Sequence, residues 1–321
     1  MYTAAHACPP PPALTIRSPK APFITVGTIT SLPPTSRTLL VSSPQSQTKK
    51  RKMSPTLNNN KDLQLLQASV DENTDSDFRF LHHGTKVRYI TIAPGLFSTD
   101  TMCFAPELIP LLPPFPSGDW NSGWIAQDAQ TGDPCFTRVE KSPVPGVRTA
   151  WHPVTLDHLD LTFGRKLRSG VYEATAPSLS PSPVVAKFAC FEWEVGYMES
   201  ECTAYQWIEN HDIGPRFLAN IAEEGRIIGF LLKNIANARH ASPADVGVCR
   251  EKLAALHRLR IVHGDINRHN FLVADDGRVT LIDFDTARRT EDPGRFEEEM
   301  RGLERELADT SGRGGCVVMS G

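Results

Sequence analysis

The chain has 321 residues and a formal net charge of −3 at pH 7. This length accommodates one two-lobed domain with additional segments, and the weak net charge gives no electrostatic reason to expect a nucleic-acid partner. Seven cysteines occur without a C-x-x-C pair, which favours reduced thiols over a disulfide framework or a zinc site. No apolar run approaches the length of a membrane span, and we expect a cytoplasmic or nuclear protein.

Residues 1–75 are predicted to form a disordered tail. They carry the proline run 9–12, many Ser and Thr, and no acidic residue before Asp62. Such a composition buries too little apolar surface to offset the entropy of ordering. The basic run 49–52 is either a nuclear import signal or a solvated stretch of the tail, and Met53 directly after it is a second candidate start.

Residues 76–155 are predicted to form a β-rich extension. Residues 87–92 alternate in side-chain polarity as a half-buried strand does. Trp120, Trp124 and Phe136 lie among Gly, Asp and Pro, a pattern typical of short strands and turns. No catalytic group of residues stands out, so we expect this region to pack on the segment that follows.

A lysine interrupts the apolar strand predicted for residues 184–188, which read Val-Val-Ala-Lys-Phe. A buried Lys187 needs an anionic partner, because an isolated charge in an apolar setting is costly. Alternatively, Lys187 extends its ammonium group to solvent from an edge strand.

A helix is predicted for residues 192–210 and offers that partner. Glu201 is the favoured partner of Lys187 because it shares a face of the helix with apolar side chains. Glu199 and Glu194 are the competing candidates, and each of these carboxylates could simply be solvated.

Two further elements lead to the most informative part of the chain. Residues 229–232 read Gly-Phe-Leu-Leu and are predicted to form an apolar strand. Ser242, Pro243 and Asp245 have the spacing of a capping box with proline in the first turn, so a helix should begin there. That helix ends shortly before His263.

Residues 263–285 read HGDINRHNFLVADDGRVTLIDFD and carry the strongest functional signal. Two β-prone runs flank an Asp-Asp-Gly turn, which predicts a hairpin. The hairpin returns Asp283 to the side of Asn270, with Asp265 five residues before Asn270. Such carboxylate and amide oxygens can hold Mg²⁺ and orient an attacking hydroxyl. The alternative is a polar surface turn followed by a buried strand.

This pattern resembles the catalytic and metal-binding loops of the protein-kinase-like superfamily. The H-x-D-x-x-x-x-N element corresponds to residues 263–270 and the D-F-G element to residues 283–285, which read Asp-Phe-Asp. His-Gly-Asp and the acidic third residue of the triplet are similar to RIO, lipopolysaccharide-core, choline and aminoglycoside kinases. A longer pattern resembles fungal-type kinase-like proteins. It consists of the segments GPRFL, GFLL, LHRLRIVHGDINRHNFLV and LIDFDTA.

The resemblance implies ATP and Mg²⁺ as cofactors and gives roles to five residues. Lys187 is the implied contact to the nucleotide phosphates, and Glu201 orients it. Asp265 is the implied catalytic base. Asn270 and Asp283 are the implied metal ligands.

The resemblance also implies a phosphate loop and a hinge, although the G-x-G-x-x-G signature is absent. Gly170 lies in the turn that would cover the phosphates, and Arg165, Lys166 and Arg168 add positive charge there or form an ordinary exposed turn. Leu232, next to the hinge, is the third implied nucleotide-binding residue, after Lys187 and Gly170.

The resemblance covers about residues 156–290 and implies an α+β, protein-kinase-like two-lobed fold. Residues 156–232 form its N-lobe, and residues 233–321 form a truncated C-lobe without an Ala-Pro-Glu sequence. We expect an ATP- and Mg²⁺-dependent phosphotransferase that acts on a hydroxyl-bearing acceptor, either a small molecule or an atypical protein substrate. The alternative is a catalytically inactive, nucleotide-binding pseudokinase or scaffold.

Overall fold

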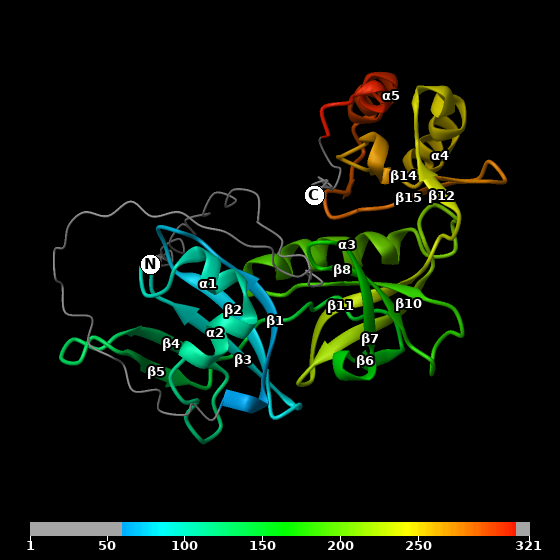
Figure 1. Cartoon of the computed structure of the whole chain (residues 1–321). Helices are drawn as coiled ribbons and strands as arrows, with labels where there is room; N and C mark the ends of the chain where they lie inside the picture. The colour runs from blue at the N-terminus through cyan, green and yellow to red at the C-terminus, as the bar shows by residue number, and fades with distance from the viewer. Residues whose placement is uncertain (1–59, 313–321) are drawn as a thin grey trace, which may run out of the picture.

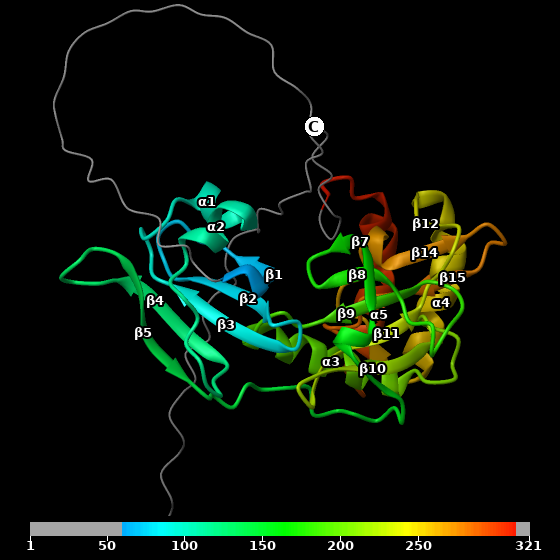
Figure 2. The ribbon, with the colours of Figure 1, turned by 60° about the horizontal axis from the view of Figure 1, so that its bottom comes forward.

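The computed structural model describes residues 60–312. Residues 1–59, which make up most of the predicted tail, and residues 313–321 lie outside the described residues. The described chain is α+β, as predicted, and consists of an N-terminal extension, a sheet-based N-lobe and a smaller C-lobe (Figures 1 and 2). No helix within residues 60–312 is both long and apolar enough to span a membrane.

The extension is a five-stranded sheet with two short helices packed on one face. The strand order is β1-β2-β3-β4-β5, and β3 and β4 run parallel. Its core contains the buried side chains of Phe78, Phe80, Ile90 and Leu108. The elements are β1 Leu63–Ser69, β2 Ser76–His82, β3 Lys86–Ile92, α1 Thr99–Cys103, α2 Ala105–Leu111, β4 Ser122–Gln127 and β5 Pro134–Glu140.

The predicted end of the tail at residue 75 is wrong. Strand β1 lies inside that range and pairs with β2 from Leu63 opposite His82 to Ser69 opposite Asp77. Leu63 is buried in the core of the extension. A short apolar stretch, Leu-Gln-Leu-Leu, was hidden by the polar, proline-rich composition of the 75 residues taken together.

A buried ion pair attaches the extension to the N-lobe, as the predicted packing requires. Arg79 of β2 donates from Nε to Glu223 of β10 over 2.8 Å, and both side chains are about 2% exposed. Tyr89 and Arg226 also donate to Glu223. Burial alone would raise the pKa of Glu223, but the charges of Arg79 and Arg226 outweigh burial and lower it. Glu223 is therefore held ionised at the junction.

The N-lobe is a six-stranded sheet with helix α3 lying between it and the C-lobe (Figure 1). The strand order is β6-β10-β11-β9-β8-β7, and all neighbours are antiparallel except β6 and β10. The elements are β6 Thr155–Asp157, β7 Thr162–Arg168, β8 Val171–Thr175, β9 Val184–Phe188, α3 Val195–Trp207, β10 Phe217–Glu223 and β11 Arg226–Lys233.

Helix α3 begins later than predicted. Residues 192–194 form a 3-10 turn, and the α-helix starts at Val195. The carboxylate of Glu194 accepts the backbone N–H groups of Cys190 and Phe191, which fixes the entry into the helix. The helix ends near Ile208, before Asn210 with its positive φ of 63°.

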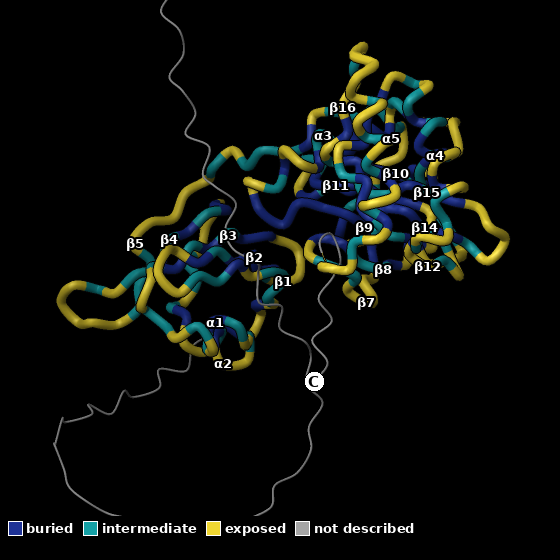
Figure 3. The backbone as a smooth tube through the Cα atoms, turned by 90° about the horizontal axis from the view of Figure 1, so that it is seen from above, coloured by how far each residue is buried: buried dark blue, intermediate teal, exposed yellow. Residues whose placement is uncertain are grey.

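The C-lobe combines two packed helices with small sheets. Leu253 and Leu256 of α4 and Leu303 and Leu307 of α5 belong to one buried core that continues into α3 and β11. Buried stretches of backbone run through both lobes, and exposed loops surround them (Figure 3). The elements are β12 Ala238–His240, α4 Val246–Arg258, β13 Ile261–Val262, β14 Phe271–Ala274, β15 Val279–Leu281, β16 Arg288–Arg289 and α5 Pro293–Ala308.

The predicted start of α4 and the predicted hairpin are both confirmed. Ser242 and Asp245 form a capping box around Pro243, and a 3-10 turn there leads into α4. Strands β14 and β15 pair antiparallel. Gly277 in their turn has a φ of 81°, a conformation that glycine adopts without steric cost.

Replacing Glu223 with Ala is expected to destabilise the protein by about 3–5 kcal/mol, because Arg79 is left buried without its counter-charge. Thermal or urea unfolding of the full chain measures the effect. A double variant, Arg79→Met with Glu223→Met, removes both charges and is expected to recover much of the loss. A Glu223→Ala variant as stable as the wild type would show that the ion pair with Arg79 does not stabilise the junction.

Candidate active site

Lys187 lies at the centre of the site, with its ammonium group between two carboxylates. Its Nζ atom forms an ion pair with Glu201 of α3 and donates to Oδ1 of Asp283 over 2.6 Å. Burial alone would lower the pKa of Lys187, but Glu201 and Asp283 outweigh it and raise the pKa. Lys187 is therefore held charged in the interior, where an unpaired ammonium group would be costly.

The predicted contact between Lys187 and Glu201 is present, and the two competing glutamates bind elsewhere. Glu199 accepts the backbone N–H of Arg148 and the hydroxyl of Thr149. The carboxylate of Glu194 caps the start of α3. These contacts leave Glu201 as the α3 carboxylate that reaches Lys187.

Asp283 follows the hairpin in a left-handed conformation with a φ of 70°, which Asp tolerates better than most residues. Its carboxylate accepts two hydrogen bonds from Arg168, from Nη1 to Oδ2 and from Nη2 to Oδ1, each of 2.8 Å. Burial would raise the pKa of Asp283, but Lys187 and Arg168 outweigh it and hold the pKa well below its ordinary range. Phe284, next in the chain, is fully buried and fixes this segment beneath α3.

The loop that carries Asp265 is ordered by its own amide side chains. Asn267 Nδ2 donates to Asp265 Oδ2 over 2.8 Å, and Asn270 Nδ2 donates to the backbone oxygen of Asp265 over 2.9 Å. His263 contacts the backbone oxygen of Ile282 through Nε2 at 3.0 Å, so it braces the loop against the hairpin. The structure therefore holds Asp265 in a defined position relative to Asn270.

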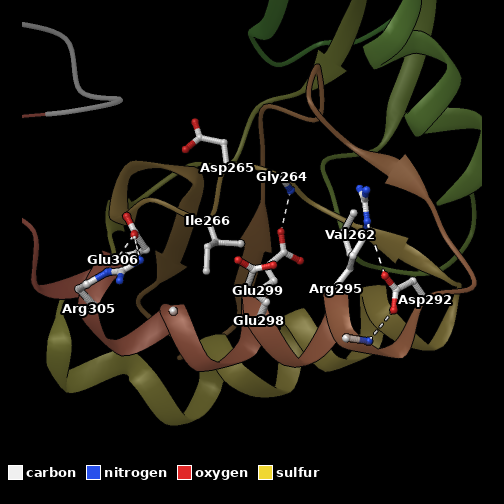
Figure 4. Close-up of a pocket in the computed structure, with 12 residues that line it drawn as sticks. Val262, Gly264, Asp265, Ile266, Asp292, Arg295, Glu298, Glu299, Arg305 and Glu306 are labelled. Carbon is white, nitrogen blue, oxygen red and sulfur yellow. Dashed lines mark hydrogen bonds and ion pairs between the residues drawn. The ribbon is translucent and has the colours of Figure 1, made fainter.

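Glu299 of α5 is a further residue that holds this loop, and the sequence did not reveal it. Its carboxylate accepts the backbone N–H groups of His263, over 3.1 Å, and Gly264, over 2.6 Å, and contacts Nε2 of His257 at 2.7 Å. Figure 4 shows Glu299 reaching Gly264 from the helix, while the carboxylate of Asp265 points away from α5. No motif distinguishes Glu299 from the other acidic residues of α5.

A cavity of about 310 Å³ lies between the lobes next to these ion pairs. Lys187, Glu201, Asp283 and Asn270 line it together, and Leu232 borders it at the end of β11. Apolar side chains form much of the remaining wall, namely Leu167, Val171, Val185, Leu272 and Ile282. Such a lining suits a ligand with an apolar part and a charged group near Lys187.

Gly170 differs from the other predicted nucleotide-binding residues in its position. It lines a separate cavity of about 230 Å³, between the β7–β8 turn and the extension. Its backbone oxygen accepts the N–H of Phe188, and a Cβ atom at Gly170 would lie 2.7 Å from the backbone oxygen of Phe188. Gly170 therefore allows the close approach of the turn to β9.

Asp283 and Asn270 carry oxygen atoms of the kind that Mg²⁺ prefers. The amide nitrogen of Asn270 is committed to Asp265, so its oxygen is the atom left to ligate a cation. No cluster of three or more His, Cys, Asp or Glu side chains suited to a metal occurs in residues 60–312. A metal here would complete its shell with phosphate oxygens and water, as Mg²⁺ does in phosphoryl-transfer sites.

Replacing Glu299 with Gln is expected to cost about 1–3 kcal/mol at pH 7, because the bound N–H groups lose a charged acceptor. Burial would raise the pKa of Glu299, but the hydrogen bonds from His257, Gly264 and His263 outweigh it and lower the pKa from 4.5. A lowered pKa means that this stabilisation is present above pH 4.5 and is lost as the pH falls further.

The stability difference between wild type and Glu299→Gln should therefore shrink below pH 4.5. Denaturant unfolding at a series of pH values measures it. The matched control is Glu298→Gln, an exposed neighbour on the same helix. A difference that stays constant with pH would show that Glu299 acts through packing alone.

Residues 231–291 match the model of the phosphotransferase enzyme family, APH. This match spans the end of β11, the loop with Asp265, the hairpin and Asp283, which is a short part of the chain. A comparison with curated proteins found no match. The two-lobed α+β fold and the paired Lys187 and Glu201 agree with this partial match, which supports a similarity to the protein-kinase-like superfamily.

Proposed function

We propose that this protein is an ATP- and Mg²⁺-dependent phosphotransferase that moves the γ-phosphoryl group to a hydroxyl acceptor. The observation that carries the proposal is the convergence of Lys187, Glu201, Asp283 and Asn270 on one cavity between the lobes. These groups come from β9, α3 and both ends of the hairpin. An ordinary structural salt bridge does not require an apolar slot beside it.

Each residue has a task that its surroundings support. Lys187 binds the nucleotide phosphates, and Glu201 keeps the ammonium group in place when phosphate binds. Asp283 and the oxygen of Asn270 hold Mg²⁺, which supplies charge neutralisation on the transferring phosphoryl group. Asp265 accepts the proton of the attacking hydroxyl.

The acceptor is expected to approach the carboxylate of Asp265, which points away from α5 (Figure 4). A second cavity, of about 540 Å³, lies toward α5 and is lined by Asp265, Gly264 and Ile266 together with residues of α5. Asp265 is linked by hydrogen bonds to Asn270, which lines the first cavity.

Replacing Asp265 with Asn is expected to lower phosphoryl transfer by about 10²–10⁴-fold, the usual contribution of a general base. Release of ADP in the presence of ATP, Mg²⁺ and a panel of hydroxyl-bearing small molecules and proteins measures it. The matched control is Asp275→Asn in the exposed hairpin turn, which should leave transfer unchanged. Equal transfer by wild type and Asp265→Asn would remove Asp265 from the reaction.

Mg²⁺·ATP is expected to stabilise the full chain by about 2.7 kcal/mol at a hundred times its dissociation constant. Thermal unfolding with ATP, with and without Mg²⁺, measures this shift. Asp283→Asn should abolish the part of the shift that depends on Mg²⁺, whereas Asp275→Asn should retain it. A Mg²⁺-dependent shift without turnover on any acceptor would favour the pseudokinase, and no shift would refute nucleotide binding.

A further inference from the structure

The β7–β8 connection has too little backbone to enclose a chain of phosphates. Arg168 pairs with Val171 across it, so only Ser169 and Gly170 form the turn. The oxygen of Gly170 accepts the N–H of Phe188, which fastens the turn to β9. Gly170 also faces the cavity on the side of the extension. The turn therefore offers few backbone N–H groups to the cavity that holds Lys187.

A side chain enters that cavity from the same turn. Arg168, the last residue of β7, lines the cavity and extends its guanidinium group to Asp283, where it forms two parallel hydrogen bonds of 2.8 Å. The other basic residues of the strand do not line this cavity: Arg165 pairs with Glu173, and Lys166 lies over the ring of Tyr172. Arg168 is thus distinguished from its neighbours by position.

Arg168 is also the more displaceable of the two cations on Asp283. Its side chain is 36% exposed, whereas that of Lys187 is 10% exposed and is paired with Glu201 as well. A divalent cation on Asp283 competes with Arg168 for the same carboxylate oxygens. A guanidinium group released in this way binds phosphate with the same two-pronged geometry that it uses for a carboxylate.

We propose that Arg168 is a nucleotide-phosphate ligand that exchanges Asp283 for the phosphates when Mg²⁺·ATP binds. This inference rests on the proposed function. In the empty site Arg168 neutralises Asp283 and keeps the cleft ordered. In the loaded site it takes the place of the backbone N–H groups that a glycine-rich loop would supply.

Calorimetric titration of the full chain with ATP, ADP and adenosine, each with Mg²⁺, tests the exchange. Arg168→Gln is expected to weaken binding of ATP and ADP about tenfold, a loss within the range for hydrogen bonds to charged groups. Binding of adenosine should change less than twofold, since it has no phosphate. Arg168→Lys, which keeps the charge but loses the fork, should lie between wild type and Arg168→Gln.

Arg165→Gln is the matched control because it removes the same charge from the same strand without touching the cavity. It should leave all three dissociation constants within about twofold of wild type, since exposed charges act weakly at a distance. A similar loss in this variant would mean that Arg168 acts only through the general field, and would overturn the proposal.

Three other outcomes would also overturn it. Unchanged or tighter ATP binding by Arg168→Gln would make Arg168 only an occupant of the empty site. An equal loss for adenosine and ATP would mean that the variant distorts the cleft. Equal affinity of the wild-type protein for adenosine and ATP would mean that no residue of the protein binds the phosphates. A wild-type protein that binds neither compound would refute the proposed function itself.

Discussion

The pairing of Lys187 with Glu201 and Asp283 is the interaction on which the arrangement of the site depends. A lysine with a 10% exposed side chain is tolerated only where counter-charges surround it. Here those charges come from α3 and from the end of the hairpin, so the lysine fastens three elements to one point. A displacement of α3 or of the hairpin would leave a charge unpaired in the interior. The position of each element is therefore coupled to that of the others through electrostatics, in addition to the apolar core that they share.

Two other buried carboxylates also hold elements of the structure together. Glu299 fixes the loop of Asp265 to α5 by accepting two backbone N–H groups, and Glu223 fixes the extension to the N-lobe by accepting Arg79. Each carboxylate is held ionised by its donors, as the lowered pKa values of both indicate. Rigid placement of the reacting groups is what phosphoryl transfer demands, because most of its catalysis is positioning and charge stabilisation. In the C-lobe, Glu299 adds a contact from α5 to the loop that Asn267 and Asn270 also order.

The sequence predicted those parts of the site that local patterning determines. The hairpin, the strand around Lys187 and the start of α4 each follow from turn, strand or capping signals within about twenty residues. Strand β1 was missed because its few leucines lie in a polar, proline-rich stretch, and their burial depends on pairing with β2. Glu299 binds Gly264, which lies 35 positions away in the chain. Arg168 binds Asp283, which lies 115 positions away. Nothing in the neighbouring sequence distinguishes Glu299 and Arg168 from the other charged residues nearby, so only the fold could select them.

The charges of the cleft determine which ligand it can accept. Glu201, Asp283 and the partly buried Asp285 face Lys187 and Arg168, and burial beside Asp283 raises the pKa of Asp285. The two cations are thus paired with carboxylates inside the cleft. A bare polyanion would have to take both cations away from Asp283 and leave that carboxylate buried without a partner. A polyanion that brings its own divalent cation draws Lys187 and Arg168 away from Asp283, but the divalent cation replaces them as its counter-charge. The charges of the cleft are therefore compatible with the proposed metal–phosphate ligand, and they favour this pair over either component alone.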